Sequence, residues 1–388
     1  MPTSGVRRQF WVKAEATYDT QQAIAATDAV DLVDMQFTPE KVLTEINSHV
    51  GTGSYQGEVE GQTGGKWTAT CDFMPTTAGT APDIGPALKA AFGDETIVGG
   101  TSVTYDFNDS DTVQTLQLVI YGGDEFYEVV TGAWVEQLTI DAVQNQVPRM
   151  TFSGGFAGYG NLRGAPSTTG SNASAATTIN MATGDGYKLA NVGAGAYIKF
   201  GSEDNGGAGY KVTSVTASTI VITPGLANTV GVATAVTPLV PSQTLVGTRI
   251  SAGIEHAMTI DAVSMGFVSA KYTIATGIKA LDRAASSSRP TRVFRTGGRI
   301  VDAELDTYFL DEMSEILGAA HASTQVLRDV AVRLGPNTAA SRAILNTDKT
   351  LFKVQPIALP DAEVAMAKLI GRARQNSAAN DEFSLVFS

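Results

Sequence analysis

One order of segments occurs twice in this sequence, and it constrains the fold more than any single motif. The order is an extended segment, a long polar stretch, an alternating strand, a short helix and several further strands. In the first copy, residues 29–46 are extended and residues 66–73 place apolar side chains on one face. Residues 82–93 carry apolar residues at helical spacing, and Gly93 is a plausible helix stop. Strands are then expected at residues 102–107, 113–121, 126–130, 133–140 and 149–153.

The second copy repeats this order. Residues 260–274 read as strand, residues 277–298 are polar, and residues 299–309 alternate, with Ile300 out of phase. Residues 310–321 predict a helix with Asp311 as its N-cap. Further strands are expected at residues 327–334, 350–358, 364–370 and 382–387, although periodicity also permits a helix over residues 363–373.

The pentapeptide TIDAV occurs at residues 139–143 and again at residues 259–263. Aligning the two copies by element order sets Asp34–Phe37 on Ser264–Phe267, and the two pentapeptides then do not correspond. A rival alignment pairs them. A five-residue match is weak, so element order is preferred and the pentapeptide is interpreted as a coincidence.

Composition divides the chain into three segments. Residues 1–163 carry 8 basic and 21 acidic side chains, residues 164–245 carry 3 and 3, and residues 246–388 carry 16 and 15, which sum to the net charge of −12. Residues 164–178 have the composition of a flexible linker. Short apolar strands follow them, so the middle segment is predicted to be a small inserted all-β module. The predicted fold is therefore mainly β, with two tandem domains that each contain one short helix.

No catalytic or metal-binding pattern emerges. His49, His256 and His321 are scattered singly, and Cys71 alternates with apolar residues as a buried side chain does. The stretch DFNDSDT lacks the glycine and the terminal glutamate of a calcium loop. We therefore expect no enzyme, no cofactor and no metal. The start of the chain lacks the apolar core of a secretion signal, and no apolar run is long enough to cross a membrane.

The two long polar stretches differ in charge. The second stretch has a single acidic residue, Asp282, and many basic ones: Lys279, Arg283, Arg289, Arg292, Arg295 and Arg299. The first carries Glu58 and Glu60, and no Lys or Arg between residues 47 and 65. Two interpretations of this charge difference are open. The two stretches are solvated loops, or they are loops that meet across a contact between subunits or between rings. Nucleic-acid binding by the arginines ranks third, because few aromatic residues lie among them.

Several segments resemble the tail tube (major tail) proteins of long-tailed bacteriophages, the siphophages, of the two-domain type. The most specific are GTAPDIGPALKAAFG, at residues 79–93, and the Gly-x-Trp at residues 132–134 with its flanking strands. Residues 288–313 and 380–388 resemble the second domain. The likeness covers nearly all of residues 11–160 and 246–388, but not the middle segment.

The resemblance implies a structural virion protein with two tail-tube β-sandwich domains. It implies homotrimeric rings with six equivalent domains, stacked into a tail tube and assembled in the host cytoplasm. Expected partners are the chain itself, the tape-measure protein, the tail terminator and the distal tail proteins. DNA passes through the lumen without specific binding, and we expect the acidic excess of residues 1–163 to face that lumen. Two alternatives are a capsid or tail decoration protein whose insert binds a host glycan, and a polysaccharide-degrading tail enzyme.

Overall fold

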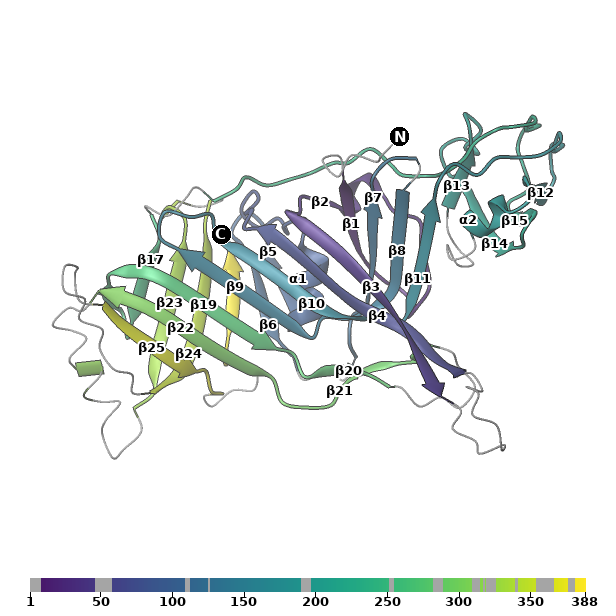
Figure 1. Cartoon of the computed structure of the whole chain (residues 1–388). Coiled ribbons are helices and arrows are strands. Elements are labelled where there is room, and N and C mark those ends of the chain that lie inside the picture. Colours follow the sequence, from purple (N-terminus) through teal and green to yellow (C-terminus); the bar gives the residue numbers. More distant parts are fainter. Residues whose placement is uncertain are drawn as a thin grey trace, which may run out of the picture.

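A computed structural model describes residues 8–45, 58–108, 112–124, 126–189, 197–250, 255–281, 289–308, 315–316, 318, 326–338, 341–353, 366–375 and 381–388. The described chain is mainly β, as predicted, and its sheets are antiparallel. Figure 1 shows a long front sheet with slanted strands, further strands behind it, and a small separate module at one end.

The first half folds into two sheets. The front strands have the order β3-β4-β10-β9, and the back strands have the order β11-β8-β7-β1-β2. The elements of this half are β1 (Gln9–Ala14), β2 (Ala29–Val30), β3 (Asp34–Glu45), β4 (Glu58–Asp72), α1 (Gly85–Phe92), β5 (Gly93–Val98), β6 (Ser102–Phe107), β7 (Leu116–Tyr121), β8 (Phe126–Ala133), β9 (Gln137–Val143), β10 (Arg149–Phe156) and β11 (Gly158–Arg163). A short 3-10 helix, Ala26–Asp28, precedes β2.

The second half has the same strand order. Its front strands run β19-β22-β25-β24, and its back strands run β26-β24-β23-β17-β18. The elements are β17 (Ala257–Ile260), β18 (Val263–Met265), β19 (Phe267–Ala275), β20 (Ile278–Ala280), β21 (Val293–Arg295), β22 (Ile300–Tyr308), β23 (Arg328–Leu334), β24 (Ala343–Lys353), β25 (Met366–Arg372) and β26 (Ser384–Phe387). The long β24 corresponds to both β8 and β9. Its first part pairs with β23 and β26 in the back sheet, and its last residues pair with β25 in the front sheet.

The internal repeat predicted from element order is therefore present in the topology. The two TIDAV pentapeptides do not correspond in it, as expected. The first lies within β9. The second ends β17, turns through Asp261 and Ala262 with positive φ, and begins β18.

The predicted helix in the first half is confirmed as α1. Pro86 stands in its first turn, where its missing N–H costs nothing, and Gly93 ends it with φ +103° and an N–H donated to the Lys89 carbonyl. Of the second predicted helix, residues 315, 316 and 318 are helical, and Asp311 lies outside the described residues. The sequence permits either a strand or a helix over residues 363–373. Residues 366–372 of this segment form a strand.

Hydrophobic packing joins the two halves. One cluster of buried residues contains side chains from both halves, including α1. At the junction, Phe92 of α1 stacks on Phe383 at 5.6 Å between ring centroids, and Phe383 also meets Tyr272 of β19 at 5.5 Å. Phe73 faces Phe387 at 6.0 Å. The two sequence-defined domains thus share a core, so each half contributes to the stability of the other.

The middle segment is a five-stranded module with the order β12-β15-β14-β13-β16. Its elements are β12 (Thr178–Asn180), α2 (Asp185–Lys188), β13 (Tyr197–Phe200), β14 (Tyr210–Val215), β15 (Thr219–Thr223) and β16 (Val236–Pro238). The flexible linker expected at residues 164–178 is wrong. Ser167, Thr168 and Asn172 make β-bridges inside the module, and the side chains of Thr168 and Asn172 also hydrogen-bond to its backbone.

The module is fixed to the first half. Trp11, Val119 and Tyr127 point away from the main core and belong to the same buried cluster as the module's apolar residues. After the module, residues 239–250 form an extended strap that runs along the first half (Figure 1). The backbone N–H groups of Thr244, Thr248 and Ile250 donate to carbonyl oxygens of residues 26, 75 and 73. These bonds hold the strap against the first half.

Candidate assembly surface

The two halves meet edge to edge in the front sheet. Strand β9, the last front strand of the first half, pairs with β19, the first front strand of the second, over seven residues from Gln137–Ala275 to Val143–Ser269. The contact is head to tail, because the two edges that meet are different edges of the repeated unit. We call it the internal seam.

The front sheet ends in the two strands that correspond to those of the seam. Strand β3, the counterpart of β19, pairs only with β4 among the described residues. At the other end, Leu351–Lys353 of β24 corresponds to β9 and pairs with β25. Unpaired strand edges carry free N–H and C=O groups that favour pairing with another chain. The molecule therefore presents two different edges of the kind that already pair at the internal seam.

The exposed face of the front sheet is polar. A row of threonines, Thr70, Thr151, Thr139 and Thr273, stands directly opposite one another across four strands and crosses the internal seam. The hydroxyls of Thr70 and Thr151 lie 3.2 Å apart. Beside this row run Thr68, Ser153 and Gln137. The opposite face of the same strands is buried in the core, which is the alternation that the sequence predicts.

Charges on this face alternate in sign. Asp72, Arg149, Asp141, Lys271 and Glu304 stand opposite one another on consecutive strands. Opposite charges in such cross-strand pairs favour the register, and Asp141 opposite Lys271 extends the pattern across the seam.

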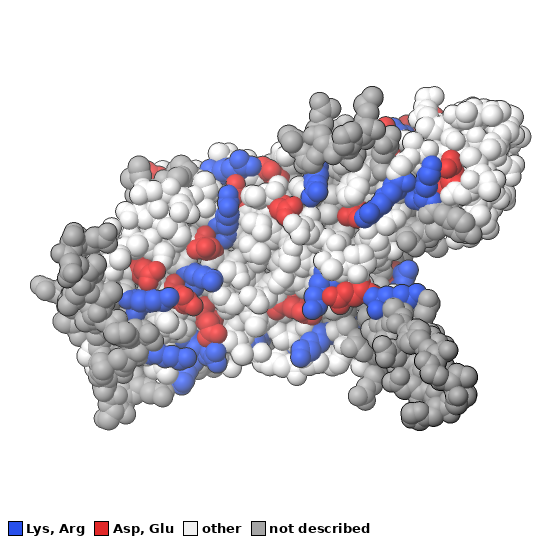
Figure 2. Space-filling model, in the orientation of Figure 1, with Lys and Arg blue, Asp and Glu red and all other residues white. Residues whose placement is uncertain are grey.

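Ion pairs neutralise several acidic side chains of the face. Arg149 lies 3.2 Å from Asp72, Lys368 3.1 Å from Glu304, and Arg372 donates two hydrogen bonds to Asp302 at 2.7 and 3.1 Å. Figure 2 shows blue and red side chains mixed over this side of the molecule, with no acidic patch. The expected acidic excess of the first half therefore does not gather on the described part of this face.

Residues 277–281 and 289–299 of the arginine-rich stretch form an arm that folds back onto the first half. Strands β20 and β21 pair with each other in this arm. Ile278 and Val293 of the arm are buried against Trp134, the tryptophan of the Gly-x-Trp motif. The Tyr18 hydroxyl donates to the Pro290 carbonyl at 3.0 Å. The arm is thus a second contact between the halves, beside the internal seam.

The basic residues predicted at a contact belong to this arm. Arg289 forms an ion pair with Asp19 at 3.3 Å, and Arg295 and Arg299 donate to the Asn108 carbonyl at 2.9 and 3.0 Å. Lys279 and Arg292 are exposed, and Arg283 lies outside the described residues. Arg289, Arg295 and Arg299 therefore make contacts within one chain, and a contact between subunits through Lys279 and Arg292 stays a prediction.

The side chains of Glu58 and Glu60, the acidic residues predicted at this contact, lie outside the described part of the chain, so their pairing stays a prediction. Glu58 and Glu60 lie in β4, opposite Glu45 and Leu43 of β3, so β4 begins inside the stretch expected to be a loop. The described partners of the arginines include Asp19, Glu382 and the backbone carbonyl of Asn108. Sequence reasoning missed them because they are distant in the chain.

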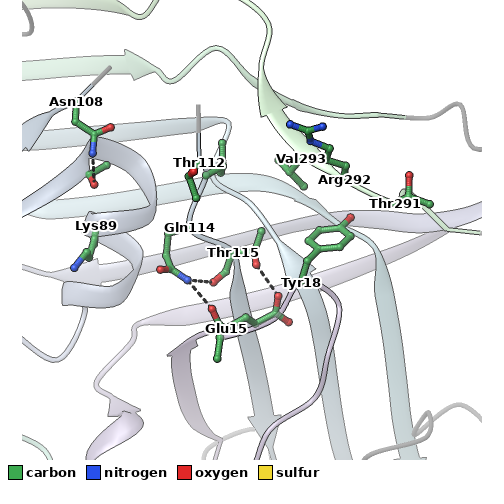
Figure 3. Close-up of a pocket in the computed structure, with 13 residues that line it drawn as sticks. Glu15, Tyr18, Lys89, Asn108, Thr112, Gln114, Thr115, Thr291, Arg292 and Val293 are labelled. Carbon is green, nitrogen blue, oxygen red and sulfur yellow. Dashed lines mark hydrogen bonds between the residues drawn. The ribbon is translucent and has the colours of Figure 1, made fainter. Parts of the chain in front are cut away.

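An open cleft of about 620 Å³ separates the arm from the first half. Figure 3 shows Glu15, Gln114 and Thr115 on one wall, and Thr291, Arg292 and Val293 of the arm on another. The buried Glu15 carboxylate accepts the Gly132 N–H at 2.8 Å and the Thr115 hydroxyl at 2.7 Å. Burial raises the pKa of Glu15 to about 7. These bonds hold the loop that presents Tyr18 and Asp19 to the arm.

Among the described residues no group of three or more His, Cys, Asp or Glu side chains is arranged to hold a metal ion. Cys71 is buried, and burial raises the pKa of its thiol. His256 accepts the Gly335 N–H, whereas His49 and His321 lie outside the described residues. Over the same residues, no helix has both the length and the apolar character needed to span a membrane.

Comparison with known proteins identifies no relative: no family model matches the chain, and no curated protein is significantly similar to it.

Proposed function

We propose that this chain is a structural subunit that joins head to tail with further copies into rings, and that the rings stack into the tail tube of a long-tailed bacteriophage. The observation that carries the proposal is the internal seam. It joins β9 to β19 and leaves the corresponding edges, on β24 and β3, at the two ends of the same sheet.

A head-to-tail contact between different edges continues until the rotation between units closes a ring. In this proposal β24 of one copy pairs with β3 of the next, as β9 pairs with β19 within the chain. Closure removes both free edges, which are an aggregation hazard in a lone subunit. The resemblance to two-domain tail tube proteins supplies the count of three chains and six domains.

The polar face of the front sheet lines the lumen in this proposal. Its threonine row and paired charges suit the passage of DNA, because a surface with little net charge releases few counterions on contact with phosphates. This replaces the acidic lumen expected from composition. Low net charge, and not repulsion, then lets DNA slide. The tape-measure protein occupies the lumen before DNA does, and the terminator and distal tail proteins bind the two ends of the tube.

Negative-stain microscopy of the purified protein tests the proposal. Hollow rods or rings are the expected result. A folded protein that stays monomeric at every concentration would refute it, and would favour the decoration or host-binding alternative.

A disulfide experiment tests the edge pairing itself. Gln36 of β3 and Leu351 of β24 lie on the polar face, as do Thr139 and Thr273 of the internal seam. A Gln36→Cys, Leu351→Cys chain should form cross-linked multimers on oxidation, with Lys353→Cys as the alternative partner in case the register differs. The matched control, Thr139→Cys with Thr273→Cys, should close only within single chains. Cross-linked multimers of the control variant would contradict the pairing. So would assembled rods in which neither edge variant forms cross-linked multimers.

A further inference from the structure

The back sheets show a difference between the two halves. In the first half, residues 93–115 connect α1 to β7 and contain the hairpin β5–β6. In the second half only residues 319–327 lie between the described helical residues and β23, too few for a hairpin of two six-residue strands. Over the described residues, the hairpin therefore has no counterpart in the second half.

The hairpin completes the junction between the halves at the back. Strand β6 pairs with β26 over four residues, from Ser384–Asp106 to Phe387–Val103. Tyr105 of β6 and Phe387 of β26 pack at 6.1 Å. The junction inside the chain thus has two layers: the internal seam in front and the β6–β26 pairing behind.

Within the described part of the chain, nothing corresponds to this second layer at a junction between two copies. The counterpart of β26 is β11, which pairs only with β8 among the described strands. The neighbouring copy would bring its second half to this place, and the described residues of that half contain no hairpin that could pair with β11. Some other element has to fill the back of the junction if it is to be as well packed as the internal one.

The module stands at this place. The chain enters it directly from the end of β11, and Figure 1 shows it beside β11, at the opposite end of the molecule from β17 and β25. Its apolar residues share one buried cluster with Trp11, Tyr127 and Leu162 on the back sheet, so its position is fixed. At the other end of the molecule, β18 is a back-sheet edge on which Val263 is 43% exposed.

We infer that the module is a clamp between subunits: it fills the back of the junction between copies and packs on the β17–β18 edge of the neighbouring copy. This inference rests on the proposed head-to-tail assembly. It assigns the module a partner, which is the second half of another copy of this chain, and it predicts that the module is an assembly element and not a receptor-binding one.

Photo-cross-linking from Val263 tests this. The full chain carries p-benzoylphenylalanine at Val263, and rods are assembled from a mixture of isotopically labelled and unlabelled subunits. After irradiation, mass spectrometry is expected to find adducts to residues 164–245 that join labelled with unlabelled chains. The unassembled protein should give none of these adducts. Val263 is exposed, so the substitution leaves the core intact.

The outcomes separate the two claims. Rods in which Val263 reacts with residues outside 164–245, or with nothing, would overturn the clamp and leave the tube intact. A folded variant and a folded wild-type chain that both fail to assemble would remove the proposed function and the clamp together. If only the p-benzoylphenylalanine variant fails to assemble, a Val263→Cys variant repeats the test. Its rods are labelled after assembly with a short maleimide-benzophenone probe. If no adducts to the module then form, the clamp is overturned.

Discussion

Replacing Arg299 with alanine should destabilise the isolated subunit. Its guanidinium lies over the Phe107 ring at 4.6 Å, donates to the Asn108 carbonyl at 3.0 Å and forms an ion pair with Glu382 at 3.4 Å. The side chains of Arg299 and Glu382 are only 10% and 14% exposed. One arginine therefore ties the arm to the first half and to the C-terminal segment.

The expected loss is about 3 kcal/mol. Removing one partner of a buried ion pair costs about 3–5 kcal/mol, because the other charge is left without compensation. A desolvated cation–π contact adds up to about 2 kcal/mol, but the two contributions share one side chain and do not simply add. Both partners keep some contact with water, so the lower end applies. Such a loss corresponds to about a hundredfold change in the unfolding equilibrium.

Urea unfolding of the unassembled subunit measures this loss. All three tryptophans, Trp11, Trp67 and Trp134, are buried in the first half, so their fluorescence reports that half, and circular dichroism reports the whole chain. Arg292→Ala is the matched control: the residue is an exposed arginine of the same arm, and its loss should change stability by less than about 0.5 kcal/mol. If Arg299→Ala unfolds at the wild-type urea concentration yet assembles poorly, the arginine acts between subunits and the structural reasoning is wrong.

Three further predictions concern the first half. The pKa of the Glu15 carboxyl is about 7 in the folded state and near 4.5 in the unfolded state, so the folded state binds its proton more tightly. The free energy of unfolding therefore falls by up to ~3 kcal/mol as pH rises from about 4.5 to about 7. Glu15→Gln should remove that part of the pH dependence, and an unchanged slope in urea midpoints against pH would count against it. Cys71 should resist maleimide in the native protein and react once urea unfolds the chain; rapid native labelling would mean that β4 is not buried as described. Gly154→Ala should cost about 1–3 kcal/mol, since an added Cβ would collide with the Trp134 carbonyl oxygen, and wild-type stability would show that the backbone there yields.

Periodicity in the sequence predicts the elements whose two faces differ. Strand β6 buries Val103, Tyr105 and Phe107 and leaves the residues between them partly exposed, and its predicted bounds of 102–107 are those observed. Strand β5 was missed because all its residues are at least partly exposed, so no apolar face marks it. Strand β11 was missed because its sequence, GYGNLR, contains glycines that favour a turn.

Contacts between distant residues could not be predicted in this way. Arg289 was singled out by its charge, but its partner Asp19 is 270 residues away and belongs to a turn with φ +50°. Composition likewise predicted a linker at residues 164–178, where specific hydrogen bonds instead build part of a module. Identical pentapeptides illustrate the same limit: Thr139–Val143 is straight because β10 and β19 flank it, whereas Thr259–Val263 bends between β17 and β18.

Each chain carries two fused units that pair through β9 and β19, and this also restricts the number of units in a closed ring. Every closed circle built from this chain has to hold an even number of units, since none can be added singly. Two kinds of boundary must then alternate around the circle, one covalently tethered and one not. Mechanical failure would begin at the untethered boundaries, so a stressed circle should split into whole chains and never between β9 and β19.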